Sequence, residues 1–330
     1  MSTAGVDGDS ITMVTGRRAD AVGIAMYLIA ALLFALNGVV AKSIILAGID
    51  PAHFTAFRNL GAMLILLLII VMTNPRSLRI TRQQLPFLAL YGVVAFTLVQ
   101  FGYFVTITRL NVGFGTLLCF LAPVIVALWL RFVRRQGGGR GIWIALGLSL
   151  LGLILIAQIW QGITFDVIGV AAGLGTAIAL SLYWMLGERG RKQRDAMSLT
   201  FWGFAFASIA WAILTPWWTF PWSVLGSGAA SFPPGDAASV TPWSIPVWPL
   251  AIGCVVLGAV VPFLLVLGSL DRIGSQRAGI VATTEPIWAT LLALVLLAEP
   301  VGPIQLLGGL IVIAGIIVAE VSSRSPRAVR

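Results

Sequence analysis

The chain has 330 residues, of which 59% are apolar and only 10% are charged, and its mean hydropathy is +1.00. Soluble domains carry roughly 25% charged residues, so the composition excludes a soluble protein and indicates an integral membrane protein. A single histidine, His53, and two separate cysteines, Cys119 and Cys254, provide neither a metal-ligand set nor a disulfide framework. We therefore expect a membrane protein that needs no cofactor.

Ten apolar segments follow one another along the chain, and each has the roughly 20 residues that a helix needs to cross a bilayer. These segments lie at 21–45, 53–73, 85–107, 112–132, 141–160, 167–187, 198–218, 247–270, 277–298 and 303–322. The polar segments 1–20 and 323–330 flank them as short tails. The sequence thus predicts an all-α integral membrane protein with ten transmembrane helices.

The placement of the basic residues explains the net charge of +9. If the N-terminus is cytoplasmic, 18 of the 21 Lys and Arg residues fall in cytoplasmic segments, Lys42 and Arg109 lie outside, and Arg58 lies within the second span. Such a bias follows the positive-inside rule. It predicts a protein of the cell membrane with both termini in the cytoplasm. The charge then reports orientation in the lipid bilayer, and we expect no nucleic-acid partner.

The segment around Pro123 is repeated around Pro286, 163 residues later. Four landmarks keep this spacing: Arg109 and Arg272, Pro123 and Pro286, Gln136 and Glu299, and Gly152 and Gly315. An odd number of spans separates the two copies, so they must be inverted relative to one another. We therefore divide the chain into a first five-helix repeat at 21–160 and a second at 167–322. Inverted repeats are typical of secondary transporters, whose substrate site lies near the bilayer midplane.

The longest connection lies at 219–246, between the seventh and eighth spans, and it is rich in Trp, Pro, Gly and Ser. It falls on the outer side of the membrane in the predicted topology. Tryptophan rings favour the membrane interface. We therefore interpret the tryptophans in and around this loop as interface anchors, in preference to a lid over a pore.

Several local patterns occur in the same order as in a known family. They are Phe34, Asn37 and Lys42 in the first span, Pro51, Phe54 and Arg58 at the second, Leu121-Ala122-Pro123 in the fourth, Thr284-Glu285-Pro286 in the ninth, and Glu299 at its end. Through these patterns the chain resembles the EamA-type members of the drug/metabolite transporter superfamily. Gln136, where the family usually has a Glu, and the long loop at 219–246 depart from the pattern. The resemblance implies a ten-helix carrier with a central cavity, which exports amino acids, metabolites or toxic organic compounds.

Glu285 is the acidic residue that we place deepest in the membrane. It stands eight residues after Arg277, which corresponds to roughly 12 Å along a helix. The adjacent Pro286 and its counterpart Pro123 lack a backbone donor, so each allows its helix to bend around a ligand. Since ionisable groups are costly at membrane depth, we expect Glu285 to bind a substrate ammonium or to take up a proton for coupling. The alternative is a neutral carboxyl that is hydrogen-bonded to a neighbouring helix.

The other candidate substrate-binding residues are polar or aromatic side chains on four spans. They are Asn37, Arg58, Gln100, Tyr103, Thr284 and Trp288, together with Glu285. Arg58 could grip a substrate carboxylate with its fork of donors, or its side chain could reach the interface without any function. Gln100, Tyr103 and Phe104 share one helix face, on which polar tips and aromatic walls suit an amphipathic metabolite. Packing between helices would also explain Asn37 and the aromatic residues.

We predict a secondary active transporter that exports a small amphipathic metabolite, amino acid or drug-like compound by alternating access. The chain has no Walker motif, so a gradient would drive transport, either of protons through Glu285 or of exchanged substrate. The sequence also lacks the HExxH and GxSxG motifs, which argues against an enzyme. A non-transporting membrane scaffold or receptor is the alternative function. The sequence leaves open whether the chain forms a homodimer.

Overall fold

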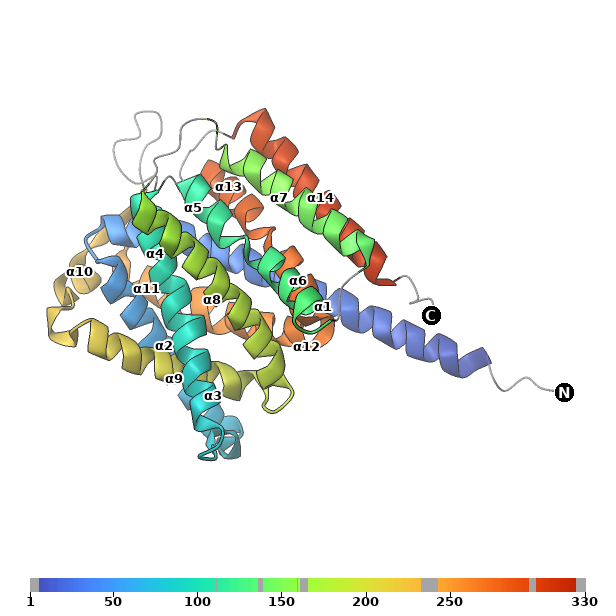
Figure 1. Cartoon of the computed structure of the whole chain (residues 1–330). Coiled ribbons are helices and arrows are strands. Elements are labelled where there is room, and N and C mark those ends of the chain that lie inside the picture. Colours follow the sequence, from blue (N-terminus) through green and yellow to red (C-terminus); the bar gives the residue numbers. More distant parts are fainter. Residues whose placement is uncertain are drawn as a thin grey trace.

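A computed structural model describes residues 6–110, 112–135, 139–158, 160, 166–232, 243–296 and 301–324. Across this part of the chain, eight helices are long and apolar enough to cross a membrane, and Leu117–Phe132 and Glu285–Leu296 are shorter apolar segments, the first of them interrupted after Cys119. The predicted all-α membrane fold is therefore confirmed (Figure 1). Two of the repeat landmarks, Gln136 and Glu299, lie outside the described residues.

The first repeat forms five membrane spans, of which the third and fourth are divided. The first two are α1 (Val6–Leu46) and α2 (Pro51–Thr73), followed by the 3-10 turn η1 (Pro75–Leu78). The third comprises α3 (Leu85–Gly92), the π-helical segment η2 (Val93–Leu98) and α4 (Val99–Arg109). The fourth comprises α5 (Val112–Cys119) and α6 (Ala122–Phe132), and the fifth is α7 (Arg140–Ala157).

The second repeat has the same plan. Its first two spans are α8 (Val167–Arg191) and α9 (Ala196–Leu214), followed by η4 (Trp217–Thr219), α10 (Trp222–Ser227), β1 (Ala229–Phe232) and β2 (Trp243–Pro246). The remaining spans are built from α11 (Val247–Val255), the π-helical η5 (Val256–Val260), α12 (Val261–Ala282), α13 (Glu285–Leu296) and α14 (Pro303–Arg324). A positive φ of 72° at Gly274 interrupts α12 and separates the eighth span from the ninth.

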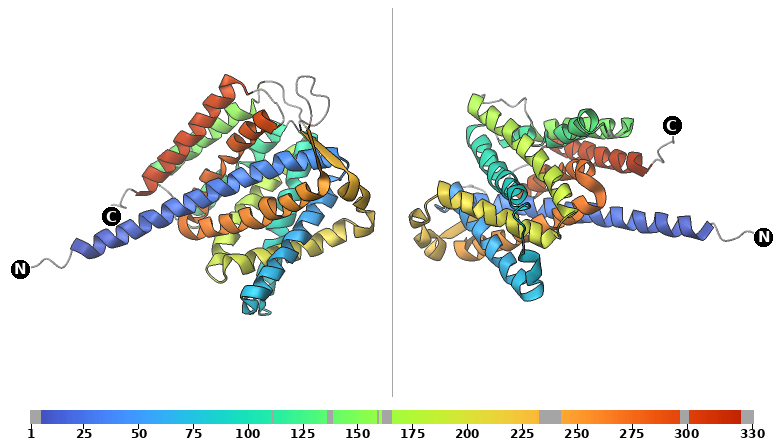
Figure 2. Two further views of the ribbon diagram at one scale, coloured as in Figure 1. Left: turned by 180° about the vertical axis from the view of Figure 1, so that it is seen from behind. Right: turned by 60° about the horizontal axis from the view of Figure 1, so that its bottom comes forward.

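Helix α1 begins at Val6, within the segment that we expected to be a tail. No proline occurs between residues 6 and 46, so the backbone has no obligatory stop before the membrane span. The N-terminal part of α1 projects beyond the other helices in both views of Figure 2.

Aspartate side chains start three of the membrane helices. Asp50 accepts a hydrogen bond from the Ala52 amide at 3.1 Å before α2, and Asp195 accepts one from the Ser198 amide at 2.8 Å before α9. Asp166 does the same before α8. Each carboxylate satisfies an amide that the first helical turn leaves without an intrahelical partner. These three aspartates therefore serve local capping.

The fourth and ninth spans break at equivalent places. α5 ends at Cys119 and α6 begins at Ala122, whereas α12 ends at Ala282 and α13 begins at Glu285. Both intervals recur 163 residues apart, and a buried proline is the second residue of each restarted helix. Proline is tolerated there because the first turn of a helix needs no amide donor. The π-helical segments η2 and η5 also begin 163 residues apart, at Val93 and Val256.

Helices α7 and α14 pack side by side along their length and run antiparallel (Figure 1). A Cβ atom on Gly152 would lie 2.6 Å from the Gly308 carbonyl oxygen, and one on Gly315 would lie 2.9 Å from the Ala145 carbonyl oxygen. Gly152 and Gly315 are equivalent by the 163-residue spacing, and so are Ala145 and Gly308. One contact is thus repeated with the roles of the helices exchanged, as the predicted inverted relation of the two repeats requires.

The two ends of the bundle differ in composition. One end, here called the basic end, carries the arginine-rich turns after α2, α6 and α8 and the turn at Gly274. The opposite end, here called the hairpin end, carries the antiparallel pair β1–β2, in which Ala229 pairs with Pro246. Part of the predicted long loop is therefore ordered, while residues 233–242 lie outside the described residues. Trp218 and Trp222 are exposed at this end, as interface anchors would be.

Candidate functional site

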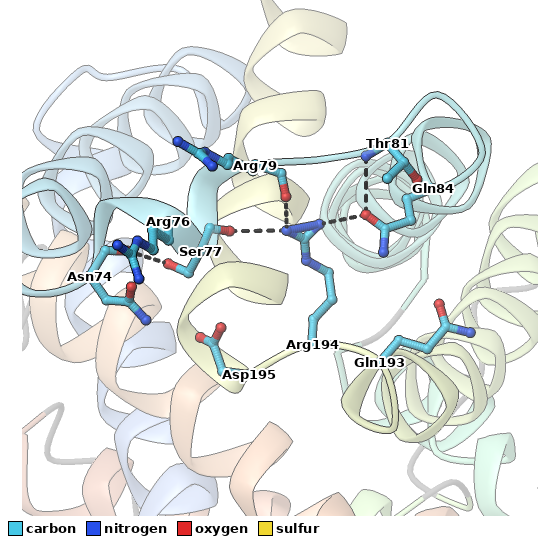
Figure 3. A pocket seen from close by; sticks show the side chains of 9 residues that line it. All are labelled: Asn74, Arg76, Ser77, Arg79, Thr81, Gln84, Gln193, Arg194 and Asp195. Carbon is cyan, nitrogen blue, oxygen red and sulfur yellow. Dashed lines mark hydrogen bonds between the residues drawn. The ribbon is translucent and has the colours of Figure 1, made fainter.

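A surface pocket of about 460 Å³ lies at the basic end, between the η1 turn and the start of α9 (Figure 3). Arg194 dominates it: its guanidinium donates to the Ser77 carbonyl oxygen at 3.0 Å and to Gln84 Oε1 at 3.3 Å, and also binds the Arg79 carbonyl. Partial burial lowers the pKa of Arg194 from its ordinary value, and the Asp195 carboxylate opposes this shift. Because this guanidinium is engaged with the protein chain itself, we interpret the pocket as a junction between the two repeats.

Deep in the bundle, Arg58 on α2 meets Gln100 on α4. The Arg58 Nη2 group donates to Gln100 Oε1, and the two side chains are only 8% and 9% exposed. Arg58 Nε and Gln100 Nε2 have no hydrogen-bond partner among the described residues. Arg58 is therefore buried and does not extend to the membrane interface. Each of the two side chains also keeps a nitrogen donor without a partner among the described residues.

The eighth span lies next to both Arg58 on α2 and Asn37 on α1. Cys254 in α11 lies close enough to Arg58 to interact with it electrostatically. One turn further, a Cβ atom on Gly258 would overlap the Asn37 side chain on α1, so the glycine leaves room for the amide. Asn37 Oδ1 is buried and has no partner in the described part of the chain.

Asn59 is a residue that the sequence analysis missed. It follows Arg58 on α2, is 0% exposed, and has no described partner for either Oδ1 or Nδ2. The signal that singled out Arg58, a polar side chain within an apolar span, applies equally to Asn59. We refer to Asn37, Arg58, Asn59 and Gln100 together as the polar cluster.

Glu285 lies at the first position of α13, where the ninth span restarts. Glu285 is half-buried as a residue, and it lies within electrostatic range of Tyr27 on α1 and Cys119 on α5. Trp184 Nε1 on α8 donates to the Tyr27 hydroxyl at 2.9 Å. These residues are here called the acid group, and they bring together two spans of each repeat: Tyr27 on α1, Cys119 on α5, Trp184 on α8 and Glu285 on α13. No sequence signal distinguished Tyr27.

The polar cluster and the acid group are linked by short contacts. Two residues after Gln100, a Cβ atom on Gly102 would overlap Thr176 on α8. Thr176 lies within hydrogen-bonding reach of Cys119, which belongs to the acid group. Thr176 therefore connects the end of the polar cluster at Gln100 with Cys119 of the acid group.

The remaining candidate residues belong to neither the polar cluster nor the acid group. Thr284 is buried, and its hydroxyl donates to the Val281 carbonyl at 2.8 Å, so it serves the break before α13. Trp288 is half-buried, and its indole Nε1 has no partner among the described residues. Tyr103 is half-buried on α4, one turn beyond Gln100. Pro123 and Pro286 are buried at the two helix restarts.

The described residues contain no group of three or more His, Cys, Asp or Glu side chains placed to hold a metal ion. The polar cluster and the acid group offer hydrogen-bonding and charged side chains. These groups can bind and orient a small polar molecule.

Both repeats match the EamA-like transporter family, at residues 21–158 and 167–320. The chain is 27% identical over 310 residues to the uncharacterized inner membrane transporter YicL of Salmonella typhimurium, covering 92% of this chain and 96% of the relative. It is 25% identical over 242 residues to the threonine/homoserine exporter RhtA of Escherichia coli, covering 73% of each chain. One crystal structure, at 16% identity, has a TM-score of 0.72 and covers 94% of this chain and 99% of the other, which shows a shared fold.

Proposed function

The chain belongs to the EamA-like transporter family, and we propose that it is a secondary active transporter that exports a small amphipathic metabolite by alternating access. The observation that carries this proposal is the set of unpaired polar atoms that the polar cluster holds inside a membrane bundle. Such atoms are costly at this depth unless a ligand or water satisfies them. A transported molecule with matching groups would supply the missing partners.

The site suits a substrate with two unlike poles. Arg58 Nε and Gln100 Nε2 are free donors on adjoining side chains, so a carboxylate could accept from both. Glu285 lies on the other side of the Thr176 and Cys119 contacts and could bind an ammonium group. An amino acid has both poles. The relative named as a threonine/homoserine exporter supports amino acids as the first compounds to test.

The arginine-rich turns support an orientation with the basic end in the cytoplasm. Export would then carry the substrate from the basic end to the hairpin end. Both termini would face the cytoplasm.

A thermal-shift screen tests the binding proposal. Purified protein is heated with threonine, homoserine, other amino acids, sugars, nucleotides and cationic drugs, as wild type and as the Glu285→Gln variant. A ligand that binds the folded state raises the melting temperature, and we expect an amino acid to do so in the wild type and to lose the effect in the variant. Glu320→Gln on α14 is the matched control, because its carboxylate pairs with Arg277 away from the polar cluster and the acid group.

Proteoliposomes test transport and coupling. With a compound that binds, we expect uptake that depends on an imposed proton gradient in the wild type. Glu285→Gln keeps the shape of the side chain and removes its titration, so it should abolish this dependence. Transport that ignores the gradient in both proteins would leave exchange or facilitated diffusion as the mechanism. A complete absence of binding and transport across the panel would contradict the proposed function and favour a scaffold.

A further inference from the structure

Five aromatic rings pack together in the half of the bundle nearer the basic end. They are Tyr91, Phe96, Tyr183, Phe204 and Phe263, here called the aromatic cluster. All five are buried, and the centroids of the rings in contact lie 4.5 to 6.1 Å apart. The third, sixth, seventh and eighth spans each contribute at least one ring. These spans are therefore held together by ring packing at this level.

The position of the cluster along the helices places it near the basic end. Tyr91 follows the start of α3 by six residues and Phe204 follows the start of α9 by eight, which corresponds to roughly 9 to 12 Å. On α8, Thr176 lies seven residues further from the basic end than Tyr183. Because Thr176 is next to Cys119, the rings lie nearer the basic end than Cys119 does, whereas Trp184, which follows Tyr183 on α8, lies at the level of the rings.

Two hydroxyl groups in this cluster are unsatisfied. The Tyr91 and Tyr183 hydroxyl oxygens are buried and have no hydrogen-bond partner among the described residues. Buried hydroxyls in native proteins are nearly always paired, and an unpaired one has to be explained. A second conformation in which water reaches the two hydroxyls would provide the partners that this conformation lacks.

The inverted repeats relate the aromatic cluster to the polar cluster. Gly169 follows Gly23 by 146 residues, and these two glycines pack on the Cβ atoms of Arg109 and Arg272, respectively. The capping residues Asp50 and Asp195 are 145 residues apart, and the third and eighth spans are related by 163. These contacts fix which positions of the two repeats are equivalent.

With these spacings, polar residues of the first repeat occupy positions equivalent to those of aromatic residues in the second repeat. The equivalent pairs are Asn37 and Tyr183, Asn59 and Phe204, and Gln100 and Phe263. Arg58 corresponds to Gly203, where the Phe96 ring lies only 2.4 Å from the place of a Cβ atom and so fills the space of the missing side chain. The aromatic cluster is therefore the repeat-related counterpart of the polar cluster.

Building on the proposed function, we infer that the aromatic cluster is the gate at the basic end, closed in this structure, and that substrate enters from that end only when its rings separate. In an inverted-repeat carrier the two access states arise when one half rocks against the other around the site. The end that bears the aromatic counterpart would close by apolar packing without a ligand. The end that bears the polar cluster needs a ligand to satisfy its donors.

Polar contacts near the same end support a closed state. Arg191 on α8 pairs with Asp271 on α12 at 3.2 Å, and Glu188 accepts from the Ser275 amide at 2.9 Å. These contacts tie the sixth span to the turn between the eighth and ninth. Phe96 itself lies in the π-helical segment η2, and such segments often mark places where a helix shifts at functional sites. The gate therefore consists of rings that pack together when closed, and its third span contains a π-helical segment at which the helix can shift.

Accessibility of Cys119 tests the gate without any substrate. If the aromatic cluster closes the basic end, a membrane-impermeant maleimide added to inside-out vesicles of a Cys254→Ala background reaches Cys119 only when the rings separate. We expect Phe204→Ala to raise the labelling rate at least about tenfold. Removing a buried ring destabilises packing by well over the roughly 1.4 kcal/mol that a tenfold shift requires.

Phe201→Ala is the matched control, because Phe201 is also a buried phenylalanine of α9 and its ring packs edge-on against Trp202. Its labelling rate should stay near that of the parent. Equal rates in the two variants, or no change with Phe204→Ala, would overturn the gate. If Phe204→Ala does not fold, Phe96→Leu provides the milder change, and the same comparison decides.

A crosslink links the gate to transport. In a cysteine-free background, Tyr91→Cys with Tyr183→Cys, at rings 6.1 Å apart, is oxidised with copper phenanthroline. The disulfide should stop transport, and reduction should restore it. Gly141→Cys with Ser322→Cys, between α7 and α14, should crosslink without that effect. Transport that continues undiminished in the crosslinked Tyr91→Cys, Tyr183→Cys protein would contradict the gate. If Phe204→Ala speeds the labelling of Cys119 as expected but no compound is transported, only the proposed function is contradicted.

Discussion

At the scale of single residues, the notable feature is a set of buried polar side-chain atoms that have no hydrogen-bond partner among the described residues. Asn37, Arg58, Asn59 and Gln100 each retain a buried donor or acceptor without a partner among the described residues. An unpaired buried group costs about 1 to 3 kcal/mol, so four such residues would weaken the fold if they had no other role. Their grouping on three neighbouring spans supports binding of a polar ligand. Stability and function are therefore expected to respond in opposite directions to the removal of these polar groups.

Asn59→Leu tests this separation. Leucine has a similar volume and no polar atoms, so we expect the melting temperature in detergent to stay level or to rise, while transport falls at least about tenfold. Ser208→Ala on α9 is the control, since it removes another buried, unpaired hydroxyl and should leave transport unchanged. A large loss of stability in Asn59→Leu would mean that the amide has a structural role.

At the scale of secondary-structure elements, the notable feature is that several membrane helices are interrupted. The fourth and ninth spans break before a proline, and the third and eighth contain a π-helical segment at equivalent positions. Irregular backbone at membrane depth is tolerated only where protein or a water-filled cavity surrounds it. These interruptions surround the polar cluster and the acid group, whereas α7 and α14 are uninterrupted and pack closely on each other. We expect the outer pair to act as a stable frame.

Gly152→Ala tests the packing of that frame. An added Cβ atom would lie 2.6 Å from the Gly308 carbonyl oxygen, so α7 and α14 would have to separate, and the melting temperature should fall by several degrees. Gly147→Ala is the control on the same helix, because nothing lies within 4 Å of its added Cβ atom. It should keep or raise the melting temperature, since alanine favours the helix by about 1 kcal/mol. Equal behaviour of both variants would show that the crossing tolerates a methyl group.

The whole molecule is organised by the inverted relation of its halves. The contact of Gly152 with Gly308 recurs as the contact of Gly315 with Ala145, which places the two repeats in opposite directions through the membrane. The basic end and the hairpin end therefore face different compartments. By the positive-inside rule, the arginine-rich turns predict that the basic end faces the cytoplasm.

Thiol labelling in intact cells tests this orientation. In a cysteine-free background, Trp218→Cys lies on an exposed residue of the hairpin end, and Gln83→Cys lies on an exposed residue of the basic end. An impermeant reagent should label Trp218→Cys at once, and Gln83→Cys only after the cells are permeabilised. The reverse pattern would place the basic end outside the cell and invert the proposed direction of export.

The sequence predicted the class, the spans and the repeat because those properties are locally encoded. A bilayer satisfies no backbone groups, so each apolar stretch of sufficient length has to become a helix whatever its neighbours are. The 163-residue spacing of Pro123 and Pro286 was visible for the same reason, and the structure places both at helix restarts. The start of α1 at Val6 was not predicted, because a polar helix beyond the membrane carries no apolar signal.

The tertiary structure alone decided which side chains meet. Arg58 and Gln100 are 42 residues apart, and Tyr27 and Trp184 are 157 apart, yet each pair is joined by a hydrogen bond. In a uniformly apolar span, composition does not reveal which face meets lipid and which meets protein, so the rotation of each helix depends on packing against distant spans. The sequence by itself therefore determined that the protein is an inverted-repeat membrane protein, and only the packed helices determined where its polar and aromatic clusters lie.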